Sequence, residues 1–134
     1  MPHQIIEYSA NLDAFMDVDA LLKALHETAK DIDALPTGGI RTRAVSRRHY
    51  AIADGHPDNA FINVTLRVAE GRTLETRQQV GERLFKTLCD FVAPIFAEQP
   101  LSLSYEIQEI KPDTRWKHSN IRDHMARRAN DAGQ

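Results

Sequence analysis

The 134-residue chain has the length of one domain, and its 42% hydrophobic and 27% charged residues predict a packed globular protein rather than a disordered one. The net charge of −2 argues against nonspecific nucleic-acid binding, and the single cysteine, Cys89, excludes an internal disulfide framework and any all-cysteine metal site. The sequence shows neither a secretory signal nor an apolar run of membrane-spanning length, so we expect a soluble, cytoplasmic protein.

The first half of the chain predicts a strand, a helix and a second strand. Residues 3–8 favour a strand, and a short polar break follows them. From Asp17 to about Lys30, apolar residues recur three or four positions apart, as on one face of a helix, and Asp17 suits the helix start. The turn at residues 36–39 then breaks the chain. Residues 40–53, rich in Val, Ile, Tyr and Arg, predict the second strand.

The second half repeats this order. Residues 60–69 are rich in β-branched side chains and predict a third strand. Thr73 is the expected N-cap of the longest helix, in which Pro94 is expected to cause a kink or an early end. Apolar and polar residues alternate over 101–110, which predicts a fourth strand with one wetter face. A short helix is expected at residues 121–128, followed by a frayed polar end.

Together these elements predict an α+β fold built from a tandem β-α-β repeat in one domain, 1–134. The first unit covers 1–58, the second 59–112, and a C-terminal extension covers 113–134. A helix that crosses between two strands makes them parallel and covers one face of the sheet, so both helices should lie on one face of a four-stranded sheet. We expect the other face to carry Ile, Val, Leu and Phe, and to be covered by oligomerisation.

Proline directly follows the initiator methionine. Methionine is usually trimmed before a small residue, and trimming would leave Pro2 with a free secondary amine at the end of a rigid strand. Such an amine is a good general base if its pKa is lowered. By itself, however, this one-residue feature is more simply explained as an ordinary N-terminal proline.

Two arginines lie at predicted element ends, where side chains converge on pockets. Arg41 follows the Gly38-Gly39 turn, and Arg72 follows Gly71 beside a helix start. Arginine binds carboxylates through two parallel hydrogen bonds, and two nearby cations would keep the Pro2 amine neutral. The alternative is that both arginines form surface salt bridges. The six histidines lack metal-ligand spacing and no phosphate-binding glycine loop occurs, so neither a metal nor a cofactor is expected.

Several segments resemble the 5-carboxymethyl-2-hydroxymuconate isomerase family of the tautomerase superfamily. They are MPHQIIEYSANL, PTGGIRTR, ADGHPDNAFINVTLRVAEGRTLETRQQVGERLF, LSLSYEIQEI and KPDTRWKHSNI. The similarity runs in register from Met1 to about Ile121, and the spacing of Pro2, Gly39-Ile40-Arg41 and Gly71-Arg72 agrees throughout. The chain departs from the family pattern in its longer tail. Catalysis would also require loss of Met1, since otherwise Pro2 is an amide without a basic lone pair.

The resemblance implies a mixed four-stranded sheet and a homotrimer with a barrel-like core. It implies a cofactor-free proton shift that converts the 2-hydroxymuconate enol to its 2-oxo isomer in homoprotocatechuate degradation. Pro2 would carry the proton, while Arg41 and Arg72 would bind a di- or tricarboxylate and polarise the developing oxo group. Two alternatives remain: another tautomerase-superfamily activity on a different unsaturated or keto acid, or a non-catalytic trimeric binding protein. No nucleic-acid or membrane partner is expected.

Overall fold

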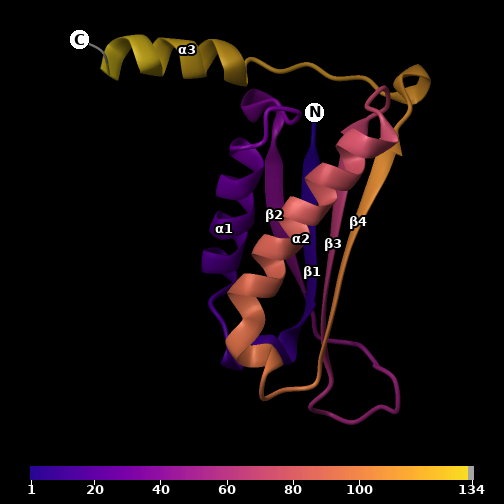
Figure 1. Ribbon diagram of the computed structural model, residues 1–134. Helices are drawn as coiled ribbons and strands as arrows, with labels where there is room; N and C mark the ends of the chain where they lie inside the picture. Colours follow the sequence, from indigo (N-terminus) through magenta and orange to yellow (C-terminus); the bar gives the residue numbers. More distant parts are fainter. Residues whose placement is uncertain (133–134) are drawn as a thin grey trace.

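A computed structural model describes residues 1–132 and has a four-stranded sheet covered by helices on one face (Figure 1). In chain order the elements are β1 (His3–Ser9), η1 (Ala10–Ala14), α1 (Val18–Lys30), η2 (Thr37–Gly39), β2 (Arg41–Arg47), β3 (Ala60–Ala69), α2 (Leu74–Phe96), β4 (Leu101–Ile110), η3 (Pro112–Thr114) and α3 (Ile121–Ala132). The sheet order is β2-β1-β3-β4. Strand β1 is parallel to β2 and antiparallel to β3, and β3 is parallel to β4. The predicted α+β fold with a mixed sheet is confirmed.

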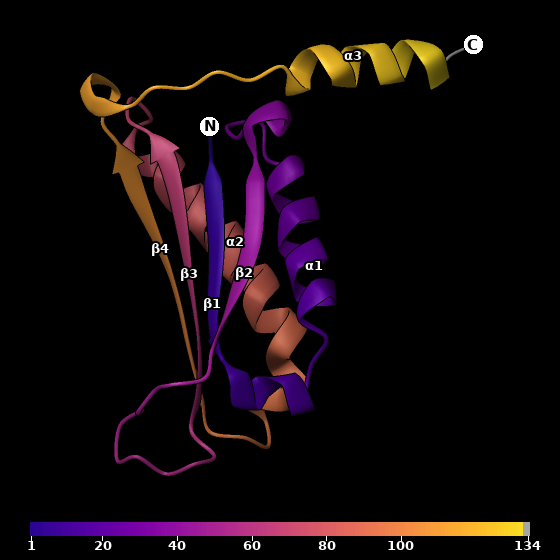
Figure 2. The ribbon, with the colours of Figure 1, turned by 180° about the vertical axis from the view of Figure 1, so that it is seen from behind.

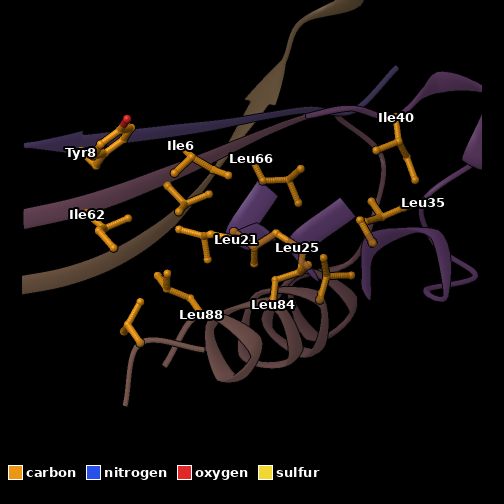
Figure 3. Packing of buried hydrophobic residues seen from close by; sticks show 14 of the residues in the cluster. Ile6, Tyr8, Leu21, Leu25, Leu35, Ile40, Ile62, Leu66, Leu84 and Leu88 are labelled. Atoms are coloured by element: carbon orange, nitrogen blue, oxygen red, sulfur yellow. The ribbon is translucent and has the colours of Figure 1, made fainter. Parts of the chain in front are cut away.

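The core lies between the sheet and helices α1 and α2. Along β1 the buried Gln4, Ile6 and Tyr8 alternate with partly exposed neighbours, as the period of a strand requires. Figure 3 shows Ile6, Ile62 and Leu66 of the sheet pointing toward leucines of both helices. The predicted apolar face of α2 is buried along its length, at Val80, Leu84, Leu88 and Val92.

Both long helices begin at the residues that the sequence indicates. The Asp17 carboxylate accepts hydrogen bonds from the backbone N–H groups of Asp19 and Ala20, and the Thr73 hydroxyl accepts one from Thr76. Helix α2 is not shortened at Pro94 but continues to Phe96. A proline in the last turn removes only one hydrogen bond of the helix. Packing of the apolar face can therefore still stabilise the helix as far as Phe96.

Two other predicted boundaries are wrong. The second strand was expected over 40–53 but ends at Arg47, because its parallel partner β1 ends at Ser9, directly opposite. Beyond that pair the chain has no neighbouring strand with which to form hydrogen bonds. The C-terminal helix was expected over 121–128 but continues to Ala132, so most of the tail predicted to fray is helical. Residues 133–134 of that tail lie outside the described residues.

The open face of the sheet is more polar than predicted. Strand register places His3 opposite Arg41 and Arg67, and the next row opposes Ile5 to Arg43 and Thr65. Apolar side chains on this face are few, because the aliphatic residues of β1 and β3 occupy the alternate positions toward the helices. The expectation of an Ile-, Val-, Leu- and Phe-rich open face is therefore wrong.

Helix α3 stands apart from the core, and none of its residues is buried. The segment before it crosses the end of the sheet where the N-terminus lies, as both ribbon views show (Figure 1, Figure 2). No helix within residues 1–132 combines the length and the apolarity needed to cross a membrane.

Candidate active site

Pro2 is buried at the start of β1 and is held by β2. Its carbonyl oxygen accepts a hydrogen bond of 3.0 Å from the backbone N–H of Arg41. Gly39 packs against it so closely that a Cβ there would lie 3.3 Å from the Pro2 Cδ and 3.2 Å from the Met1 Cα. The missing side chain at Gly39 therefore leaves the Pro2 ring room, and the backbone contact gives the ring a fixed position. The sequence prediction that a strand would hold this residue rigidly agrees with this geometry.

Arg41 begins β2 beside the N-terminus. Its side chain donates a 2.9 Å hydrogen bond from Nη1 to the Gly39 carbonyl oxygen and is half-buried. Because Arg41 lies opposite His3 in the sheet, its side chain starts from the open face. Four of its five N–H groups make no hydrogen bond within residues 1–132, so they are available to an acidic ligand.

Arg72 approaches from the end of β3, where Gly71 adopts a φ of 120° that favours glycine. Its Nε and Nη2 donate to the Ala34 carbonyl oxygen at 3.0 and 2.8 Å, and Nη1 donates to the Ala69 carbonyl oxygen at 3.0 Å. The guanidinium thus joins the end of β3 to the loop after α1, with two N–H groups left over.

Neither arginine forms an ion pair within residues 1–132, where the salt bridges involve other side chains. The alternative of surface salt bridges therefore does not describe Arg41 or Arg72. Both guanidinium groups are fixed by backbone carbonyls, which leave their positive charge unneutralised. Such groups favour an anion nearby and disfavour a second cation.

The electrostatic effect is visible at the N-terminal amine. Burial and the positive charges of Arg115, Lys117, Arg72 and Arg41, in that order, lower the pKa of the Met1 amine from 8.0 to about 6. The Met1 amine is therefore largely neutral at pH 7. The predicted cations Arg41 and Arg72 both contribute to the lowered pKa of the Met1 amine, but Arg115 and Lys117 contribute more.

Arg115 and Lys117 are the site residues that sequence reasoning missed. Arg115 donates from Nη2 to the Met1 carbonyl oxygen at 3.4 Å, across 114 positions of sequence. Both belong to the KPDTRWKHSNI segment, whose dense positive charge was the available signal. Their position was not predictable, because only the tertiary fold returns the C-terminal extension to the N-terminus.

His3 also borders this end of the sheet. Burial and the neighbouring Arg43 and Arg41 lower the pKa of its imidazole, and Arg43 Nη1 lies 3.1 Å from its Nδ1. A neutral imidazole among cations can accept a hydrogen bond. Across residues 1–132 no three His, Cys, Asp or Glu side chains gather in a way that could hold a metal ion.

Comparison with known proteins gives consistent matches over nearly the whole chain. The family model described as 5-carboxymethyl-2-hydroxymuconate isomerase matches residues 2–125. A 5-carboxymethyl-2-hydroxymuconate Delta-isomerase of Escherichia coli is 36% identical over 121 residues, which are 90% of this chain and 96% of that protein. The crystal structure of a 5-carboxymethyl-2-hydroxymuconate isomerase from Deinococcus radiodurans R1 superposes with a TM-score of 0.86 at 36% identity, covering 92% of this chain and 93% of that one.

A more distant similarity concerns the fold alone. A wild-type fused 4-OT, described as a symmetric trimer, superposes with a TM-score of 0.60 at 12% identity. The alignment covers 87% of this chain and 93% of the other. The tandem β-α-β architecture is thus a fold that this chain shares with the fused 4-OT.

Proposed function

Because this chain belongs to the 5-carboxymethyl-2-hydroxymuconate isomerase family and is an isomerase, we propose that it isomerises 5-carboxymethyl-2-hydroxymuconate in homoprotocatechuate degradation, with the Pro2 amine as general base. The observation that carries this proposal is the position of Pro2. It is buried at the end of a strand, next to cations that have no carboxylate partner within residues 1–132.

The proton transfer needs only one neutral amine. The Pro2 nitrogen takes the proton of the 2-hydroxyl group, and the electrons of the O–H bond form the carbonyl at carbon 2. The double bonds of the substrate shift, and one of the substrate's carbon atoms takes the same proton back from the Pro2 nitrogen. Atoms and charge balance without a further reactant, and the base returns to its starting state.

The arginines supply the binding energy and the electrostatic stabilisation in this proposal. The N–H groups that Arg41 and Arg72 do not use within residues 1–132 bind carboxylate oxygens and face the charge that develops on the 2-oxo oxygen. Their positive charges also disfavour protonation of the Pro2 amine, so one feature serves both substrate binding and base strength.

The active form of the enzyme begins at Pro2. With Met1 attached, the Pro2 nitrogen is an amide, and its lone pair is delocalised into the carbonyl group. Removal of Met1 converts this nitrogen into a secondary amine in the same cationic surroundings that lower the pKa of the Met1 amine.

The substrate is tested by comparing two enols. Protein that begins at Pro2 is expected to ketonise 5-carboxymethyl-2-hydroxymuconate with a kcat/KM at least about 10-fold above that for phenylenolpyruvate, which lacks the additional carboxylates that arginines bind. Spectrophotometric rates at matched enzyme concentration measure this ratio. A reversed ratio would favour the alternative of another tautomerase-superfamily activity. No turnover of either enol would favour a non-catalytic binding protein.

We also propose that the enzyme is a homotrimer. The fold similarity to a fused 4-OT that is a symmetric trimer supports this assembly, and the unpaired outer edges of β2 and β4 offer strands for pairing with neighbouring copies. Analytical ultracentrifugation at micromolar concentration is expected to give three times the chain mass of 15.2 kDa. A species of the mass of one chain would contradict the trimer.

A further inference from the structure

A cavity of about 300 Å³ lies between the N-terminus and the C-terminal segment. One side is formed by Met1 and the two glycines of η2, and the other by side chains of the segment before α3 and by the first turn of α3. The lining residues are Met1, Gly38, Gly39, Lys117, His118, Ser119 and Arg122. Figure 2 shows this segment passing over the end of the sheet at which β1 begins. The cavity borders the proposed active site, because Gly39, which lies against Pro2, is one of its lining residues.

Within residues 1–132, the charged side chains that line the cavity are all positive. Lys117 and Arg122 both line it, and no aspartate or glutamate does. Within residues 1–132 neither of them takes part in a salt bridge. A hollow lined by charge of one sign concentrates the field and attracts an ion of the opposite sign. Two cations facing one cavity are therefore suited to an anionic ligand.

Met1 lies between this cavity and the Pro2 nitrogen, the proposed base. Its carbonyl carbon is bonded to the Pro2 nitrogen, and its carbonyl oxygen accepts a hydrogen bond from Arg115. In protein without Met1, a substrate oxygen next to Pro2 would take the place of this acceptor of the Arg115 hydrogen bond. When Met1 is removed, its volume joins the cavity, and the Pro2 nitrogen comes to border it. The reacting end of a substrate would then lie near Arg115 and its far end toward Lys117 and Arg122.

We propose that Lys117 and Arg122 of the C-terminal extension form a carboxylate subsite that binds the acid group of the substrate farthest from the Pro2 nitrogen. This subsite rests on the proposed function, which supplies the class of substrate, a conjugated acid with two or three carboxylates. Arginine binds one carboxylate through two parallel N–H groups, and lysine adds a point charge. The extension thereby selects polycarboxylates over monocarboxylates.

The absence of a side chain at Gly38 leaves room for the Arg122 side chain. A Cβ at Gly38 would lie 2.5 Å from the Arg122 Cγ and 2.8 Å from its Nε, so any side chain there would displace Arg122. The φ of Gly38 lies outside the positive range, and alanine can adopt that backbone. Gly38→Ala therefore moves the Arg122 guanidinium without changing the charge of the protein.

Steady-state kinetics of the Lys117→Gln/Arg122→Gln variant test the subsite. The assay uses protein without Met1 at a pH well above the pKa of the Pro2 amine, where loss of the Lys117 charge does not change the fraction of neutral amine. Under these conditions the KM for 5-carboxymethyl-2-hydroxymuconate is expected to rise about 10-fold with little change in kcat, because binding away from the reacting atoms is equally strong in ground and transition states. The KM for phenylenolpyruvate should not change. The matched control is Arg127→Gln/Arg128→Gln, which removes the same charge from exposed positions of α3 and should leave both KM values as they are.

Two further measurements separate this subsite from the proposed function. Gly38→Ala is expected to raise the same KM in the same direction, although less, and it serves if the double variant fails to fold by circular dichroism. Calorimetry with tricarballylate, a saturated tricarboxylate, should show weaker binding to the Lys117→Gln/Arg122→Gln variant. Weaker binding in a protein that never isomerises the enol would support the subsite and refute the function. An unchanged KM and an unchanged tricarballylate affinity in folded variants would overturn the subsite alone.

Discussion

Protein that retains Met1 is expected to turn over 5-carboxymethyl-2-hydroxymuconate about 10²- to 10⁴-fold more slowly than protein that begins at Pro2, the range that a positioned general base contributes. The reason is the bonding of the Pro2 nitrogen, which is an amide before trimming and an amine after it. Retained Met1 also fills part of the space between Gly39 and the C-terminal segment, where the reacting end of the substrate would lie.

Treatment of the Met1-retaining protein with methionine aminopeptidase measures this effect. Intact-mass spectrometry follows the loss of one methionine residue, and activity should rise in proportion to the trimmed fraction. Heat-inactivated aminopeptidase is the control. Pro2→Ala, trimmed in the same way, keeps a primary amine and should lose only part of the rate. Full activity in protein with Met1 still attached would rule out the Pro2 amine as the base.

Arg72→Ala is expected to lower kcat/KM about 100-fold, since hydrogen bonds to a charged group contribute up to about 3 kcal/mol each. The change also removes a cation from the surroundings of the amine. Loss of this charge raises the pKa of the Pro2 amine, so a larger fraction is protonated at a given pH. The acid limb of the rate profile should accordingly move to higher pH in the variant, with Pro2 as the terminal residue in both proteins.

A matched control is needed because Arg72 also holds the carbonyls of Ala34 and Ala69. Arg83→Ala removes another arginine that donates to a backbone carbonyl after α1, at Asp31, but it is not among the charges that shift the N-terminal amine. It should leave kcat/KM and the pH profile unchanged. If Arg72→Ala folds and retains the wild-type kcat/KM and pH profile, Arg72 is a structural tether and not a substrate ligand.

The local pattern of the chain was sufficient for most of the fold. The β-branched residues of 60–69 predicted β3 and alternation predicted β4, both with the observed bounds. Apolar periodicity predicted the buried face of α2. The N-caps Asp17 and Thr73 were also predictable, because a cap depends on side chains within a few residues of it. The predicted end of β2 was wrong because a strand ends where its partner ends, which is a property of β1 and not of residues 48–53.

Residue type and short-range spacing were enough to predict the four strands and the helices α1, α2 and α3, the tandem repeat, and the candidates Pro2, Arg41 and Arg72. The charges that surround the N-terminal amine, in contrast, follow from the tertiary fold. It brings Arg115 and Lys117, which lie more than 110 residues from Met1 along the chain, close to the N-terminus. There they lower the pKa of the Met1 amine more than Arg72 or Arg41 does. It also decided that the open sheet face is polar, because strand register assigns each residue to a face. Electrostatic interactions act through distance in space, which spacing along a sequence does not specify.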